Sequence, residues 1–210
     1  MNPSLQAPLR RALITTLLAS GTGLALAAAS VGQPAPAFSA VDTSGKTVSL
    51  ADFKGRTVVL EWVNPGCPFV QKHYNSANMQ GTQKEAAAKG VVWLAINSTA
   101  ADASDYKTPQ AMAQWMSGHK AAATAMLMDA DGKLGRAYGA RTTPHLYIVD
   151  GGGTLVYAGA IDSKPSANPA DIASATNHVK QALAETSAGK PVSQPSTRPY
   201  GCSIKYGSGA

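Results

Sequence analysis

Cys67 is the residue of this sequence whose type and position most clearly allow chemistry. It stands in the turn Asn64-Pro65-Gly66-Cys67-Pro68, between an apolar, β-branched run and a helix-forming stretch. The unpaired N–H groups and the positive dipole end at a helix N-terminus favour a thiolate over a thiol. Pro68 suits the first helical turn, where its missing N–H has no partner to lose. The pattern predicts a nucleophilic cysteine. The alternative is a structural cysteine that is buried or disulfide-bonded.

Cys202 is the only other cysteine. Its distance from Cys67 along the chain fits neither a C-x-x-C motif nor a zinc-finger spacing. It lies in a Pro-rich C-terminal tail, residues 189–210, which also carries Tyr200 and Tyr206. Because a disordered tail rarely holds aromatic residues and a lone cysteine, we expect this tail to dock onto the rest of the protein.

The elements that must position these cysteines alternate between strands and helices. We expect buried strands over residues 57–63, 91–97, 125–128 and 146–149, a hairpin strand over 154–157, and an N-terminal hairpin of residues 38–41 and 46–50. Helices are predicted over residues 68–89, 109–118, 133–138 and 169–185. This order predicts an α/β fold with a central mixed β-sheet and helices on both faces. Residues 30–188 are expected to form one domain.

The first 29 residues resemble a secretory signal peptide. Arg10 and Arg11 precede a modest apolar run, which ends in Ala27-Ala28-Ala29. We therefore expect cleavage after Ala29, a periplasmic location, and contact with a membrane only through this signal. An uncleaved anchor is the alternative, although Thr15 and other polar residues make the run weakly apolar. An oxidising compartment would allow Cys67 and Cys202 to form a disulfide.

The charge pattern does not predict a nucleic-acid partner. The chain has a formal net charge of +6, to which the predicted signal peptide contributes two arginines. The lysines are scattered along the sequence rather than clustered, and no basic stripe of the kind that follows a phosphate backbone is present.

From about Val31 to Asp162 the chain resembles the thioredoxin superfamily. It is most similar to the redoxin branch, which includes alkyl hydroperoxide reductase and thiol-specific antioxidant proteins. The residues that carry the resemblance are Pro34, Pro36, Phe38, the strand–Cys67–helix unit, Tyr138-Gly139, and Thr143-Pro144 before a strand. The resemblance implies a thioredoxin-like fold. It also implies that Pro144 is cis and faces the cysteine, and that Thr143 offers backbone groups to a substrate.

Two further residues are assigned through the resemblance. Glu61 lies six residues before Cys67, at the offset of the buried acid of thioredoxins, and is expected to accept or relay a proton. Its alternative is an ion pair with Lys or Arg at the edge of the sheet. Asn64 stands where peroxiredoxins carry a threonine, and is expected to replace that hydroxyl as a hydrogen-bonding group. With Pro68 it would border the substrate.

The sequence also departs from both families. The second cysteine of a thioredoxin motif is replaced by Val70, so a local dithiol is excluded. The proline that peroxiredoxins carry seven residues before their reactive cysteine is replaced by Leu60. The peroxide-activating pattern is therefore incomplete.

These residues predict a thiol oxidoreductase without a cofactor. Cys67 would attack a peroxide or a disulfide, leaving a sulfenic acid or a mixed disulfide, and Cys202 would resolve it. An external thiol reductant would then reset the pair. Two alternatives stay open at this point. One is a copper-binding chaperone that uses Cys67 and His73, and the other is an inactive domain stapled by a Cys67–Cys202 disulfide.

Overall fold

The computed structural model describes residue 1 and residues 28–207. The predicted signal peptide lies almost wholly outside these described residues. Within the described part of the chain, no helix has the length and apolar character needed to cross a membrane.

A seven-stranded mixed sheet forms the centre of the fold. Its strands stand in the order β2-β1-β5-β4-β3-β7-β8. Their bounds are β1 Ser39–Asp42, β2 Thr47–Ser49, β3 Val58–Trp62, β4 Val92–Asn97, β5 Ala125–Met128, β7 His145–Val149 and β8 Leu155–Gly159. Strands β3, β4 and β5 are mutually parallel, whereas β7 runs antiparallel to β3. The three central strands β3, β4 and β7 are fully buried, as their continuous apolar runs predict.

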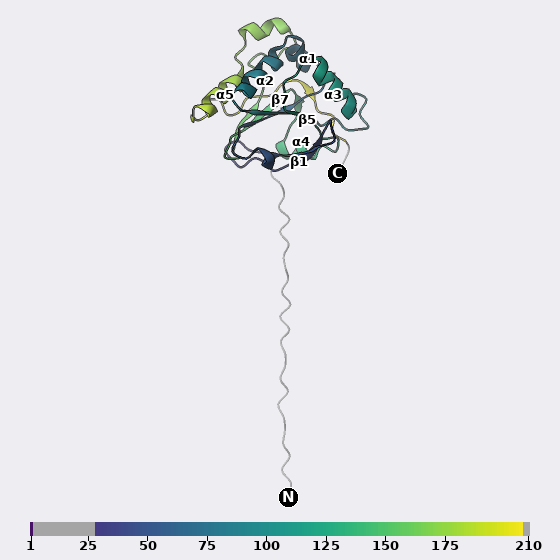
Figure 1. Ribbon diagram of the computed structural model, residues 1–210, viewed down its shortest axis with the longest axis vertical. Coiled ribbons are helices and arrows are strands. Elements are labelled where there is room, and N and C mark those ends of the chain that lie inside the picture. Colours follow the sequence, from purple (N-terminus) through teal and green to yellow (C-terminus); the bar gives the residue numbers. More distant parts are fainter. Residues whose placement is uncertain (2–27, 208–210) are drawn as a thin grey trace.

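Helices cover both faces of this sheet, and each face has its own apolar core. One face is packed by α1 Pro68–Asn75, α2 Asn78–Ala88, α3 Pro109–Gly118 and α5 His178–Ser187. The other is packed by α4 Lys133–Tyr138 and the short 3₁₀ helix η1 Leu50–Phe53. Figure 1 shows the four helices on one side of the sheet and α4 on the other. The predicted α/β fold class is confirmed.

Two predicted helices are each divided in two. The helix expected over residues 68–89 is interrupted at Ser76 and Ala77, where Ala77 takes a left-handed conformation with φ of 59°. The Ser76 hydroxyl donates to the Lys72 carbonyl at 2.7 Å, which closes the first helix locally. The helix expected over 169–185 begins instead as a 3₁₀ helix, η2 Pro169–Ser174. The chain becomes extended at Ala175, and α5 then starts under a new N-cap, Asn177.

The C-terminal tail docks on the domain, as its aromatic residues predict. It runs beside β8, where the Thr197 amide donates to the Ala158 carbonyl at 3.2 Å. Gly159 makes this approach possible, because a side-chain carbon there would collide with Thr197. The tail then forms β9 Cys202–Ser203, which pairs antiparallel with β6 Thr142–Thr143. Cys202 is thereby placed opposite Thr143.

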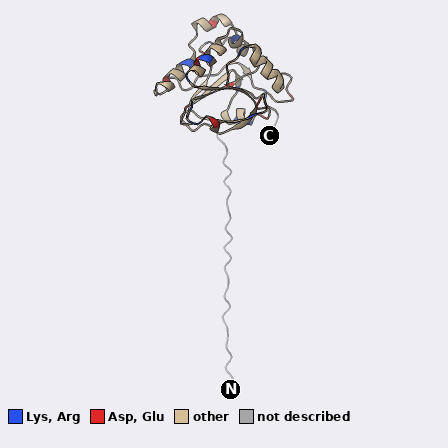
Figure 2. Ribbon diagram, viewed as in Figure 1, with Lys and Arg blue, Asp and Glu red and all other residues tan. Residues whose placement is uncertain are grey.

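Charged side chains are distributed over several elements. Figure 2 shows Lys and Arg at separate places on the helices and loops, with Asp and Glu among them. This distribution agrees with the scattered lysines of the sequence.

Candidate redox site

The turn between β3 and α1 holds Cys67 in a fixed position. The Asn64 side-chain oxygen accepts a hydrogen bond from the Gly66 amide at 2.8 Å, and the Asn64 carbonyl accepts one from the Cys67 amide at 3.1 Å. Cys67 is the N-cap residue of α1, and Pro68 occupies the first helical position, where it is exposed. The predicted strand–cysteine–helix unit is therefore present.

The Cys67 sulfur is covered rather than open. Only 1% of the residue is exposed, and it belongs to the apolar core on the α1 face. Its thiol donates to the Thr143 carbonyl at 2.9 Å, and its sulfur accepts from the Cys202 amide at 3.4 Å. Two residues far apart in the sequence thus meet at one sulfur atom.

Thr143 and Pro144 form the opposite wall of this site. The peptide bond between them is cis, as the resemblance predicts. The backbone of Thr143 is paired with Cys202 through the β6–β9 ladder. Gly201 allows this pairing, because its φ is 137° and a side-chain carbon there would collide with the Thr143 carbonyl oxygen.

Cys202 differs from Cys67 in exposure. It is half-buried, and both cysteines are free thiols in this structure. Burial, with the hydrogen bond and the charge of the nearby Cys67 sulfur, raises the pKa of Cys202 to about 12. Cys202 is therefore a neutral thiol at neutral pH.

Glu61 lies in the central strand β3 and is fully buried. It is on the face of the sheet that α1 covers, where Cys67 and the hydrogen-bond partners Tyr74 and Trp93 also lie. Its carboxyl group accepts from the Tyr74 hydroxyl at 3.0 Å, the Gln83 amide at 3.1 Å and the Trp93 indole at 2.7 Å. Burial outweighs these hydrogen bonds and raises the pKa of Glu61 to about 7. The alternative of an ion pair at the sheet edge is wrong, because β3 is a central strand and these partners are uncharged.

The Asn64 side chain makes its hydrogen bonds with residues other than Cys67. Its amide nitrogen donates to the Thr99 hydroxyl and to the Asp105 carboxylate, each at 3.1 Å. Asn64 therefore shapes the turn that carries Cys67, and its contacts with a substrate stay a prediction.

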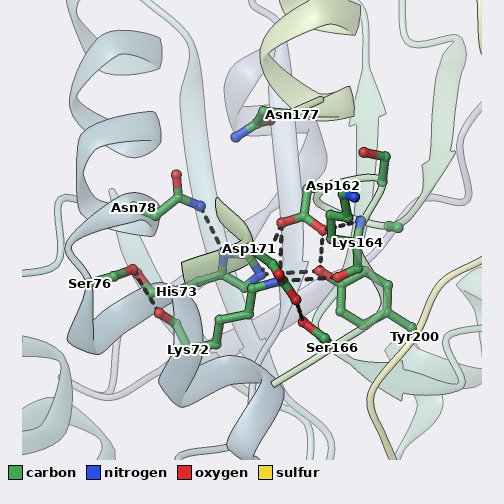
Figure 3. Close-up of polar contacts among 12 residues, drawn as sticks. Lys72, His73, Ser76, Asn78, Asp162, Lys164, Ser166, Asp171, Asn177 and Tyr200 are labelled. Carbon is green, nitrogen blue, oxygen red and sulfur yellow. Dashed lines mark hydrogen bonds and ion pairs between the residues drawn. The ribbon is translucent and has the colours of Figure 1, made fainter. Parts of the chain in front are cut away.

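Sequence reasoning missed a buried polar cluster beside this site. The side chains of Lys72, His73 and Asp162 are 0%, 0% and 3% exposed, and they gather around the hydroxyl group of Tyr200 (Figure 3). One signal was available in the sequence, since Lys72 and His73 follow Cys67 on the same helix and Tyr200 precedes Cys202 by two residues. Asp162, which contacts both Lys72 and Tyr200, could not be singled out from the sequence.

The copper alternative required His73 to face the reactive cysteine. In the structure its Nδ1 lies 2.8 Å from the Asn78 side-chain nitrogen and its Nε2 lies 3.2 Å from the Tyr200 hydroxyl. Both ring nitrogens are thus engaged in the polar cluster. Among the described residues, no group of three or more His, Cys, Asp or Glu is arranged to hold a metal ion.

The fold and the position of Cys67 define the class of protein. A mixed sheet with helices on both faces, a cysteine at the start of the first helix after a central strand, and a cis-proline against that cysteine are those of the thioredoxin superfamily, and of its redoxin branch. A comparison with protein families agrees, since the AhpC/TSA family matches residues 31–158. The chain belongs to the AhpC/TSA family.

Solved structures extend the likeness beyond the family-matched segment. A hypothetical protein from Sinorhizobium meliloti is 25% identical, with a TM-score of 0.73, and the similarity covers 87% of this chain and 98% of that one. An uncharacterized conserved protein from Geobacillus kaustophilus is 28% identical, with a TM-score of 0.73 and coverage of 86% and 94%.

A third structure carries a functional description. It is a protein from Chlorobium tepidum described as a thiol:disulfide interchange protein DsbE, with 25% identity, a TM-score of 0.50 and coverage of 62% and 85%. No curated protein sequence matched the chain. The family and this neighbour support a thiol-based redox role.

Proposed function

We propose that this protein is a thiol–disulfide oxidoreductase whose redox couple is the pair Cys67 and Cys202. The observation that carries the proposal is the 3.4 Å contact between the Cys202 amide and the Cys67 sulfur, made across 135 positions of the chain. A structural staple would need only the two sulfurs to meet. Here Cys67 also stands at the start of a helix, a position that activates a thiol, and it lies against the cis peptide bond of Thr143 and Pro144.

The exchange proceeds in two balanced steps. The Cys67 thiolate attacks one sulfur of a substrate disulfide, so that a Cys67–substrate bond forms, the substrate S–S bond breaks and one substrate thiolate leaves. Cys202 then gives its proton to solvent, and its thiolate attacks the Cys67 sulfur and expels the second substrate thiolate. The substrate gains two electrons, and the protein is left with a Cys67–Cys202 disulfide. An external thiol reductant restores the dithiol by the reverse exchange.

The high pKa of Cys202 fits the order of these steps. While Cys67 is a free thiolate, its charge helps to keep Cys202 protonated. Once Cys67 has entered a mixed disulfide, that charge is gone and Cys202 loses its proton more easily. The second cysteine thus becomes more reactive once the first has reacted.

The surroundings of Cys67 favour a disulfide over a peroxide as the oxidant. Asn64, at the place of the peroxiredoxin hydroxyl, is held by Thr99 and Asp105. Its amide is therefore not free to orient a peroxide at Cys67. A cleft of about 610 Å³ runs along the tail and is lined by Thr142 and Gly201, among others. It offers a larger partner an approach beside the pair.

The proposed setting is an oxidising compartment outside the cytoplasm, reached through the predicted signal peptide of residues 1–29. Such a compartment suits a protein whose cysteine pair cycles through a disulfide. The partners we propose are a disulfide-bearing substrate and an external thiol reductant, either a thioredoxin-like protein or a small thiol.

Two assays on the protein from residue 30 onward test this function. One follows reduction of a model protein disulfide with a thiol reductant present, and the other follows consumption of hydrogen peroxide under the same conditions. We expect disulfide reduction by the wild type, none by Cys67→Ser, and a stable mixed disulfide on Cys67 in Cys202→Ser. Peroxide consumption that exceeds disulfide reduction would replace this proposal with a peroxidase.

A further inference from the structure

The sulfur that must attack a partner is almost completely covered. With 1% of Cys67 exposed, an external disulfide reaches it only after the tail segment over it has moved. The same segment carries Cys202 and must be in place for the second step. A tail that is docked therefore slows the attack by Cys67 on a partner but favours the later attack by Cys202 on Cys67.

Tyr200 anchors the tail segment just before Cys202 in the sequence. Its hydroxyl donates to the Asp162 carboxylate at 2.5 Å (Figure 3). Its ring packs edge-on against Phe69 of α1, with the ring centres 5.8 Å apart. Only Gly201 separates this anchor from Cys202, so the anchor restrains where the second sulfur can lie.

The acceptor of Tyr200 is itself held by a buried cation. The Lys72 ammonium lies 3.4 Å from the Asp162 carboxylate and donates to the Lys164 carbonyl at 3.1 Å. Both side chains are removed from water, and the Lys72 ammonium lies directly against the carboxylate that accepts from Tyr200. A hydrogen bond to a charged acceptor is stronger than one between neutral groups.

His73 completes the docking site as a neutral donor. Burial lowers the pKa of His73 to about 4, with the neighbouring Lys72 acting in the same direction and Asp162 opposing it. The Asn78 amide donates to Nδ1, so the ring proton lies on Nε2 and points to the Tyr200 oxygen. Tyr200 thus accepts from His73 and donates to Asp162.

On the basis of the proposed exchange function, we infer that Tyr200 is a positioning residue for the second step. Docked in the cluster of Lys72, His73 and Asp162, it holds Cys202 against Cys67. Helix α1 then serves both cysteines, since it carries Cys67 at its first turn and the Tyr200 docking site one to two turns later. Loosening Tyr200 uncovers Cys67 and takes Cys202 away from it.

The test uses Tyr200→Phe, which removes only the hydroxyl group, and Tyr206→Phe as a matched control. Tyr206 belongs to the same tail, and its hydroxyl donates a hydrogen bond to the Ala140 carbonyl at 2.8 Å. Reduced protein is mixed with one equivalent of 5,5′-dithiobis(2-nitrobenzoate), and release of thionitrobenzoate is followed in time. Attack by Cys67 releases the first anion, and closure by Cys202 releases the second.

We expect Tyr200→Phe to slow the second release about tenfold, the order of effect that follows from losing a hydrogen bond to a charged group. The first release should become faster, because Cys67 is less covered. Tyr206→Phe should match the wild type in both phases. Thermal unfolding of both variants verifies that the fold is kept. A second phase that Tyr200→Phe leaves unchanged, or that Tyr206→Phe slows equally, overturns the inference.

Failure of the exchange function itself has a different signature. A wild-type protein that releases one anion and keeps the adduct contradicts closure by Cys202. In that case the role of Tyr200 is tested by alkylation of Cys67 in a Cys202→Ser background. Tyr200→Phe should accelerate that alkylation, and equal rates overturn the inference.

Discussion

At the scale of single residues, the two cysteines lie in different environments. Cys67 has the helix-start position but lies under the tail, whereas Cys202 is half-buried and is a neutral thiol with a pKa of about 12. Neither environment follows from the residue type. Each depends on the other cysteine, since the Cys202 amide contacts the Cys67 sulfur and the Cys67 charge raises the Cys202 pKa.

Glu61 provides a prediction about stability at this scale. Its pKa rises from an ordinary 4.5 in the unfolded chain to about 7 in the fold, chiefly through burial. Between these values the folded state binds more protons, so the contribution of Glu61 to stability is complete below pH 4.5 and falls as the pH rises through 7. The size of this loss is roughly 3 kcal/mol, at about 1.4 kcal/mol for each pH unit.

The substitution Glu61→Gln should remove this dependence. The glutamine oxygen can still accept from Gln83 and Trp93, its amide group can donate to the Tyr74 hydroxyl, and it does not titrate. Thermal unfolding between about pH 4 and pH 8, a range that extends beyond both pKa values, measures the effect. The wild type should lose stability across this range and the variant should show a flatter profile. Parallel profiles would show that Glu61 does not titrate as described.

At the scale of elements, the short ladder between β6 and β9 joins the tail to the cis-proline loop. It contains only two residue pairs, one of which is Thr143 with Cys202. Gly201 is the residue on which this ladder depends, because any side chain there would collide with the Thr143 carbonyl. A change at Gly201 therefore acts directly on the distance between the two sulfurs.

We expect Gly201→Ala to separate β9 from β6 and to slow closure of the Cys67–Cys202 disulfide by at least tenfold, since one buried ladder contact is worth about 1.4 kcal/mol. Gly189→Ala is the matched control. Gly189 also has a positive φ, of 68°, but has open space around its α-carbon. Both variants incur backbone strain of about 1 kcal/mol. Equal closure rates in the two, followed by mass change after oxidation and alkylation, would contradict a role for the ladder.

At the scale of the whole molecule, local sequence patterns were sufficient to predict the sheet and the strand–cysteine–helix unit. Apolar runs such as residues 91–97 predict buried strands, and the turn before Pro68 predicts a helix that starts at Cys67. The breaks within two predicted helices were missed, because alanine gives no sequence signal for the left-handed turn at Ala77 and the N-cap Asn177 was placed in the interior of a helix.

The polar cluster and the path of the tail could not be predicted from the sequence. Asp162, Lys72 and Tyr200 come from three distant segments, and only the folded chain brings them together. The pairing of Cys67 with Cys202 was expected only because no other cysteine exists. The structure adds three features that hold Cys202 beside Cys67, which are the Gly201 contact, the β6–β9 ladder and the Tyr200 anchor.

The central claim is that Cys67 and Cys202 form a reversible redox couple, and a redox titration tests it most directly. The protein is equilibrated in glutathione buffers of graded potential, quenched with acid and alkylated, and the fraction of Cys67–Cys202 disulfide is measured by mass. We predict that the disulfide forms and equilibrates within the range that these buffers cover. A disulfide that never forms, or one that stays closed below about −300 mV as structural disulfides do, would contradict the claim.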